Sequence, residues 1–394
     1  MKLKKFIIFL IIVIGALSIG LTTYYFVRNN EVISIQTKQV YCNLGDEISV
    51  SSLGIKIKNK NTGKKTTFNY NAGGKDVTDL IKYDSKKKSY VVNNVEGGVV
   101  DVVISTTNKK QRKLQFKVFI GAGTTDDPYY IKNQQDLSKI GKGFDINKAF
   151  LLMADIELDE TFDPIGYNQD SNSVVAFNGH FNGNSKTISN LNLTKDYGTA
   201  GLFAEIGSSA VVEDLKVASA TILGNNSRVG ALAGISAGKI KRVSVVNANI
   251  LTTANNYNVG ALAGLVSGDV ELSYVDQAKL EVCASSGYVG GFAGVQDRST
   301  VVTSYVNNVE IIGSNSLSVA GGFVGQLKIG SNSGRIVQSY ANATSDKQSF
   351  SGFIGEMIEA SDLIKILIKC YAIWLVTLQL CQILLAHLRF QIHI

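Results

Sequence analysis

The chain has 394 residues, enough for two or three domains. Four cysteines and two prolines exclude a disulfide-stapled mini-protein, a collagen and a proline-rich linker array, and 45% hydrophobic with 18% charged residues excludes general disorder. The net charge of +7 is unevenly distributed, because residues 1–30 and 31–120 carry +4 and +8 whereas residues 121–359 carry −7. The basic excess lies in the first third, and a nucleic-acid partner is not expected.

The N-terminus has the pattern of an export segment. Three lysines within the first five residues precede an uncharged apolar stretch, residues 6–26. Such a stretch is long enough to span a bilayer, and the positive flank favours a cytoplasmic start. Ala16 and Ser18 offer a small-x-small cleavage pattern. We expect residues 1–30 to be a membrane anchor or a cleaved signal peptide, with everything that follows translocated.

Residues 31–120 alternate between apolar and polar positions in short runs, such as Glu47–Val50 and Leu114–Phe119. Glycine- and asparagine-rich turns separate six or seven of these runs, a spacing typical of an antiparallel sandwich. In strand number and position this segment resembles the bacterial Ig-like modules that precede surface domains, although it has no Cys-Trp-Cys pattern. Its lysines indicate a solvated basic face or, as an alternative, a patch for a polyanion such as a cell-wall polymer.

Glycine blocks recur at a fixed period after residue 200. Their final glycines are 30, 30, 31 and 30 residues apart, and a second signature of β-forming residues lies between successive blocks. A period of this size indicates stacked supersecondary units. The final glycines are Gly234, Gly264, Gly294, Gly325 and Gly355.

No segment of the repeats has helical periodicity, so we expect a β-solenoid, of the right-handed β-helix type, rather than a helical solenoid. Stacked coils bring equivalent residues into ladders, and Tyr274, Tyr305 and Tyr340 should form one of them. The glycines of the blocks should permit tight corners and close approach of neighbouring backbones.

At these blocks, and in a lead-in that includes residues 127–131, 150–156 and 177–191, the chain resembles the GLUG-motif repeat proteins of bacterial surfaces. That resemblance covers residues 126–372 and implies a β-solenoid. The family has an acidic residue in the loop that corresponds to residues 179–185, and this chain lacks it, so a metal or catalytic role for the loop loses support. We expect a lead-in or cap at residues 121–200 and repeats at residues 201–372.

Few residues have the pattern of a catalytic site. The three histidines lie outside any HExxH motif, and no cysteine–histidine pairing is evident. The best group of acids could act as paired catalytic carboxylates or bind calcium, but solvated charges on the cap explain it better. We therefore expect no catalytic, cofactor-binding or metal-binding residues and no enzymatic activity. The acids are Asp155, Glu157, Asp159, Glu160 and Asp163.

Polar loops at residues 225–227 and 255–258 could bind an extracellular glycan or protein, although turn chemistry alone accounts for them.

After Gly355 the glycine blocks stop. Cys370 occupies a serine position of the repeat, and residues 373–394 are apolar. A frameshifted or truncated reading frame, a divergent capping helix and a second membrane segment are the competing explanations for this tail.

Together these features predict an all-β protein of the bacterial cell membrane, with its bulk outside the cell, or a secreted protein. Its expected role is adhesion or ligand binding without catalysis. Two alternatives are a non-catalytic fragment of a larger repeat-bearing surface protease and a β-helix carbohydrate-active enzyme.

Overall fold

The computed structural model describes residues 32–34, 39–49, 56–58, 64–70, 81–84, 89–92, 98–106, 113–283, 286–313, 319–330, 334–346, 350–359 and 370–372. The chain divides into two compact units, Met1–Tyr129 and Tyr130–Ile394. Within the described ranges, no helix is long and apolar enough to cross a membrane. The predicted export segment at residues 1–30 and the apolar tail at residues 373–394 lie outside these ranges.

The first unit is built from short strands. Strands β2, β9, β8 and β5 form a four-stranded sheet, β3, β7 and β6 form a three-stranded sheet, and β1 pairs with β4. Pairing is antiparallel apart from β2 with β9. Ig-like membership stays a prediction. The strands are β1 (Val32–Ser34), β2 (Gln39–Asn43), β3 (Glu47–Ser49), β4 (Lys56–Lys58), β5 (Lys64–Tyr70), β6 (Ile81–Asp84), β7 (Ser89–Val92), β8 (Gly98–Thr106) and β9 (Lys113–Gly121).

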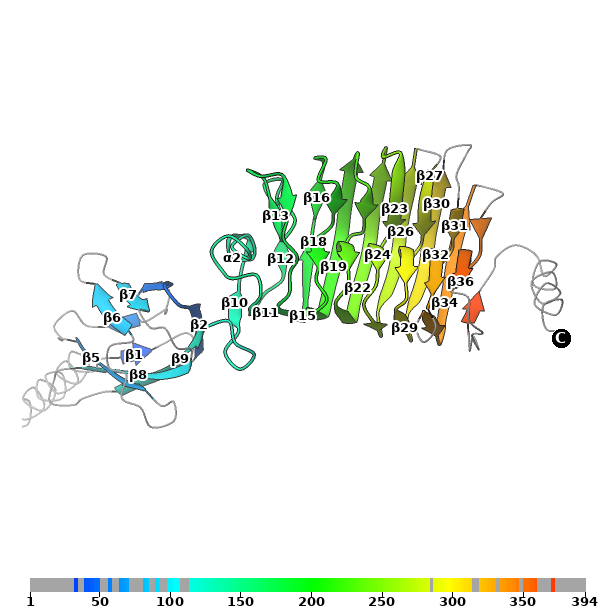
Figure 1. The fold of residues 1–394 in the computed structure, drawn as a ribbon. Helices are drawn as coiled ribbons and strands as arrows, with labels where there is room; N and C mark the ends of the chain where they lie inside the picture. Colours follow the sequence, from blue (N-terminus) through cyan, green and yellow to red (C-terminus); the bar gives the residue numbers. More distant parts are fainter. Residues whose placement is uncertain are drawn as a thin grey trace, which may run out of the picture. The chain divides into compact units, whose positions relative to one another are not determined.

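The second unit is a β-solenoid whose strands stack coil upon coil (Figure 1). Its largest sheet follows the order β10-β11-β15-β19-β22-β26-β30-β34-β37, with shorter strands beside this path. The members are β10 (Tyr129–Ile131), β11 (Ala149–Leu152), β12 (Ile156–Glu157), β15 (His180–Ser189), β16 (Asn192–Leu193), β19 (Val211–Gly224), β22 (Lys239–Thr252), β25 (Val270–Glu271), β26 (Tyr274–Val282), β29 (Thr300–Val302), β30 (Tyr305–Gly313), β33 (Arg335–Val337), β34 (Ser339–Ser345) and β37 (Cys370–Ala372).

Two further sheets of six parallel strands complete the wall of each coil. The first consists of β17 (Thr199–Ala200), β20 (Arg228–Val229), β23 (Asn256–Gly260), β27 (Ser286–Gly290), β31 (Val319–Gly321) and β35 (Phe350–Ser351). The second consists of β18 (Phe203–Ile206), β21 (Ala233–Ser236), β24 (Ala263–Val266), β28 (Ala293–Asp297), β32 (Val324–Ile329) and β36 (Ile354–Glu359). The lead-in contains the short helix α2 (Gln134–Leu137) and the hairpin of β13 (Tyr167–Asn168) and β14 (Ser173–Val174).

The register confirms the sequence period. Val229 pairs with Val259, and Val259 pairs with Val289, so that each coil places the same repeat position above the last. Parallel in-register pairing hydrogen-bonds every strand to its equivalent in the next coil, which satisfies backbone groups that a single coil would leave exposed. The β-solenoid is thereby confirmed, whereas its right-handed sense stays a prediction.

The glycine blocks lie at the bend between the two six-stranded sheets. A Cβ atom on Gly230 would lie 2.3 Å from the Cα of Ala263 in the next coil, and one on Gly260 would lie 2.4 Å from the Cα of Ala293. Such distances exclude any side chain, which explains the recurring glycine and confirms the expected close approach of neighbouring backbones.

Two more corners per coil use residues with positive φ that are not glycine. Arg242 (φ 52°), Leu272 (51°) and Thr303 (48°) belong to one column, and Asn247 (58°) belongs to the other. The left-handed conformation turns the chain sharply within one residue, so each long strand bends without leaving its sheet.

Equivalent side chains fill the core in continuous columns. Phe292, Phe323 and Phe353 stack with ring centroids 4.6 and 5.0 Å apart. Val212, Ile240 and Val270 form another column and are fully buried. Stacking like on like buries apolar surface that one coil could not cover.

Candidate functional site

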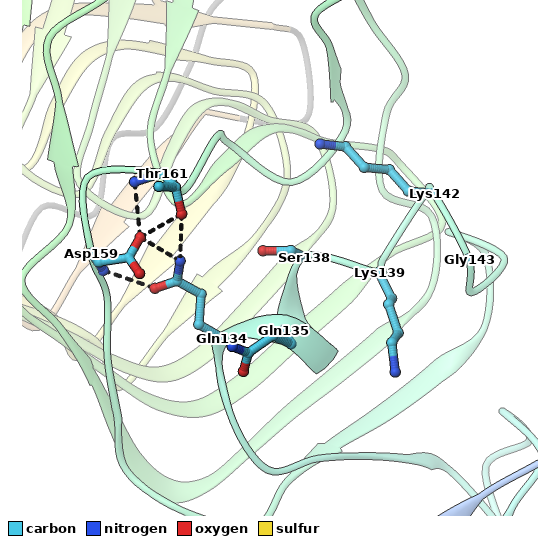
Figure 2. A pocket seen from close by; sticks show the side chains of 8 residues that line it. All are labelled: Gln134, Gln135, Ser138, Lys139, Lys142, Gly143, Asp159 and Thr161. Atoms are coloured by element: carbon cyan, nitrogen blue, oxygen red, sulfur yellow. Dashed lines mark hydrogen bonds between the residues drawn. The ribbon is translucent and has the colours of Figure 1, made fainter. Parts of the chain in front are cut away.

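An open depression lies in the lead-in, beside helix α2 (Figure 2). Its volume is about 470 Å³. Gln134 Nε2 donates to Asp159 Oδ1 at 2.7 Å and to Thr161 Oγ1 at 3.1 Å, while Gln134 Oε1 accepts from the backbone N–H of Asp159. These groups therefore bind one another and fasten α2 to the loop that follows β12. The other lining residues are Gln135, Ser138, Lys139, Lys142 and Gly143.

Three of the acids singled out in the sequence, Asp155, Asp159 and Asp163, are each held by a partner of their own. Asp155 accepts a hydrogen bond from the backbone N–H of Thr187, whereas Asp163 pairs with Lys195 Nζ at 3.0 Å. Hydrogen bonds from the Thr161 hydroxyl and the Gln134 amide lower the pKa of Asp159, so this carboxylate is ionised at neutral pH. Each of the three carboxylates has a different structural partner.

The remaining acids, Glu157 and Glu160, are exposed. Among the residues that the structure describes, no group of three or more histidine, cysteine, aspartate or glutamate side chains is arranged to hold a metal ion.

Charged and polar side chains on β15, β19 and β22 form a network across three coils. Arg242 Nη2 donates to Asp214 Oδ2 at 2.7 Å and to Glu213 Oε2 at 2.8 Å, and His180 Nε2 lies 2.8 Å from Glu213 Oε1. Hydrogen bonds from Arg242 lower the pKa of Asp214. These charges satisfy one another, which is typical of a network that joins neighbouring strands.

The polar loops have structural roles. Asn226 is 1% exposed, and its Oδ1 accepts from the backbone N–H groups of Tyr197 and Gly198 in the preceding coil. Tyr257 is also buried. Its hydrogen bonds to the preceding coil therefore explain why an asparagine occupies position 226. Asn225, Asn255 and Asn256 are exposed.

The predicted tyrosine ladder is confirmed. Tyr274 and Tyr305 stack with centroids 4.8 Å apart and planes inclined by 3°, and Tyr305 and Tyr340 stack at 5.0 Å and 1°. The three rings are half-buried on the outer face of β26, β30 and β34. None of their hydroxyls has a hydrogen-bond partner among the described residues.

A polar column runs beside the tyrosines, two residues further along each strand. Asn342 Nδ2 donates to Asn307 Oδ1 at 3.1 Å, and Asn307 Nδ2 donates to Asp276 Oδ1 at 2.9 Å. Asn308 also donates to Asp276 Oδ1. Since a side chain two residues further along a strand points to the same face, this column and the tyrosines form one surface.

We call this surface the tyrosine strip. It consists of Tyr274, Tyr305, Tyr340, Asp276, Asn307 and Asn342. The period of the sequence predicted the tyrosine ladder but not the polar column. The column consists of one aspartate and two asparagines, so it does not repeat a single residue type. The constant offset of two residues from each tyrosine was the available signal. Burial, the neighbouring tyrosines and Asp276 raise the pKa of Tyr305, so its hydroxyl remains a donor at neutral pH.

No family model matches the chain, so the resemblance to GLUG-motif proteins stays a prediction. The chain is 36% identical over 137 residues to halomucin of Haloquadratum walsbyi. The alignment covers 32% of this chain and 1% of halomucin. It is 32% identical over 130 residues to a protein of Evansella cellulosilytica provisionally named Gly-rich membrane protein, which covers 32% of this chain and 15% of that protein. The matched segments are thus small parts of both relatives.

A crystal structure from Bacteroides ovatus, of a protein provisionally named immunoglobulin A1 protease, is similar with a TM-score of 0.41 and 15% identity. The similarity covers 61% of this chain and 86% of that one.

Proposed function

We propose that the protein is a non-enzymatic β-solenoid of the bacterial cell surface, or a secreted one, that binds an extracellular ligand through the tyrosine strip. The single observation that carries the proposal is the row of half-exposed tyrosines beside a row of hydrogen-bonding side chains on a regular sheet. Tyrosine presents a large rigid contact surface with a polar tip and loses little conformational entropy on binding.

The proposed location rests on two lines of support. Residues 1–30 have the sequence pattern of a membrane anchor or signal peptide. One relative is by name a membrane protein, and the other is named halomucin. We therefore infer that the solenoid acts outside the cytoplasm, with the membrane as its partner when the anchor is retained.

The dispersed acids favour binding over catalysis. A retaining or inverting glycosidase needs two carboxyl groups that face one substrate bond. The carboxylates of Asp155, Asp159 and Asp163 each have a different structural partner. No observation in the lead-in favours the two enzyme-related alternatives.

The test is a binding assay with the full-length chain in mild detergent, against an array of extracellular proteins and cell-surface polysaccharides. The triple variant Y274F/Y305F/Y340F removes three hydroxyls and keeps the stacked rings. Tyr288→Phe, on the half-buried Tyr288 of β27, is the matched control. We expect binding that the triple variant weakens and the control preserves. No retained ligand, or equal binding by all three proteins, would contradict the proposal.

A further inference from the structure

We propose that the ligand of the tyrosine strip is a neutral linear polysaccharide that lies along the solenoid axis. The inference rests on the proposed function and specifies the ligand of the same surface. Four properties of the strip carry it: the spacing of its rungs, its free hydrogen-bonding groups, its charge and its width.

The spacing sets the direction of the ligand. The tyrosine centroids are 4.8 and 5.0 Å apart along the direction in which the coils stack. A pyranose unit of an extended β-1,4-linked chain is about one strand spacing long. A polysaccharide placed along the axis therefore meets an equivalent pair of side chains at each successive sugar ring.

The free groups define the chemistry of the contact. The rings stack face to face, so that Tyr305 presents its edge and hydroxyl outward. The three tyrosine hydroxyls have no partner among the described residues, and the same is true of Asp276 Oδ2 and Asn342 Oδ1. Phenol hydroxyls donate and accept, while the two oxygens accept. This set complements the hydroxyl groups of a sugar chain.

The charge of the strip disfavours a polyanion as the ligand. Asp276 is the charged member of the strip and accepts hydrogen bonds from Asn307 and Asn308. Residues 121–359 carry a net charge of −7. A sulfated or uronic-acid polymer would meet like charge here, which costs affinity and slows association.

The width disfavours a folded protein as the ligand. The strip is two side chains wide, and its three rings together span about 10 Å. A specific protein–protein interface typically buries about 800 Å² on each partner, far more than six half-exposed side chains offer. A single extended chain fits these dimensions.

The experiment titrates the full-length chain in mild detergent with neutral β-1,4-linked glucose and N-acetylglucosamine oligosaccharides of two to eight units. We expect affinity to rise up to about three units, one for each rung of the described strip, and then to level off. Tyr305→Phe should weaken binding about 2- to 10-fold, the equivalent of one neutral hydrogen bond. Tyr288→Phe should leave it unchanged, and the affinity should be nearly independent of salt.

The two proposals fail differently. If a protein ligand alone is retained and Y274F/Y305F/Y340F abolishes its binding, the polysaccharide inference is overturned and the proposed function stands. A preference for hyaluronan or polyuronate, steep salt dependence, or affinity that does not vary with oligosaccharide length also overturns the inference. If oligosaccharides bind equally well to the triple variant, the strip is not their site, and both proposals fall.

Discussion

At the scale of single residues, the corners of the coils carry backbone strain. Leu272 has a φ of 51° and its side chain is 49% exposed. A branched apolar residue in the left-handed region costs about 1 kcal/mol relative to glycine or asparagine. Its backbone N–H still donates to the carbonyl of Val302, so the conformation belongs to the coil-to-coil ladder rather than to the side chain.

We predict that Leu272→Asn raises the free energy of unfolding by up to about 1 kcal/mol, because asparagine tolerates this conformation. The reverse exchange at the other corner, Asn247→Leu, should lower it by a similar amount, since Asn247 has a φ of 58°. Urea unfolding followed by circular dichroism measures both. Equal midpoints for the two variants would contradict the assignment of strain.

A buried serine ladder is the second residue-scale feature. Ser304 Oγ accepts from the backbone N–H of Ser273 and donates to the carbonyl of Val302, and Ser339 Oγ accepts from the N–H of Ser304. Cys370 pairs in register with Ser339, as its repeat position predicted.

Ser304→Ala should destabilise the protein by about 1–3 kcal/mol, because it leaves a buried N–H without its acceptor. Thr253→Ala, at an exposed hydroxyl in the same solenoid, is the control and should change stability by less than about 0.5 kcal/mol. Thermal unfolding distinguishes the two variants. A loss confined to Thr253→Ala would refute a stabilising role for the ladder.

At the scale of strands, charge links neighbouring coils on the outer face. Lys239 Nζ lies 2.7 Å from Glu271 Oε1, and Arg242 binds Asp214. Hydrogen bonds from these cations lower the pKa of both carboxyls from their ordinary values of 4.5 and 3.8. A carboxyl whose pKa is lower in the folded state stabilises the fold above its unfolded pKa, and this stabilisation is lost as the pH falls through the folded pKa.

The double variant D214N/E271Q should therefore lose less stability than the wild type between about pH 5 and pH 2. At neutral pH the variant should be no more stable than the wild type, because it lacks the ionic contacts. Urea midpoints measured across this range test the prediction. If the urea midpoints of the two proteins fall equally as the pH is lowered, groups other than Asp214 and Glu271 determine the loss of stability in acid.

The sequence predicted the strands of the solenoid better than its corners and side-chain networks. Glycine at the close approach of Gly230 to Ala263 has no substitute, so the period was visible in one residue type. The positive-φ corners accept arginine, leucine and threonine alike, because the backbone ladder imposes the conformation. The polar column has no single residue type, since its hydrogen bonds need only a side-chain oxygen or amide at each rung, so only its constant offset from the tyrosines marks it.

At the scale of the whole molecule, the solenoid is a one-dimensional stack in which each coil contacts its neighbours. Val229 and Val259 occupy equivalent repeat positions, so deletion of residues 230–259 removes one whole coil and leaves the tyrosine strip intact. We predict a folded β-rich protein with the strip's binding retained. Deletion of residues 230–244 removes half a coil and should abolish cooperative unfolding. Circular dichroism and the binding assay measure the outcome, and loss of folding in both deletions would contradict independent coils.

The parallel register also determines how the solenoid responds to force. Hydrogen bonds between coils run along the stacking axis, so tension between the first and last coils pulls directly on these bonds and detaches coils one after another from an end. Each coil holds 30 residues between equivalent positions. A detached coil adds about 100 Å of extended chain in place of one strand spacing of about 4.8 Å. A tethered molecule of this design would lengthen in steps under load, and the coils that remain folded would keep their tyrosines in register.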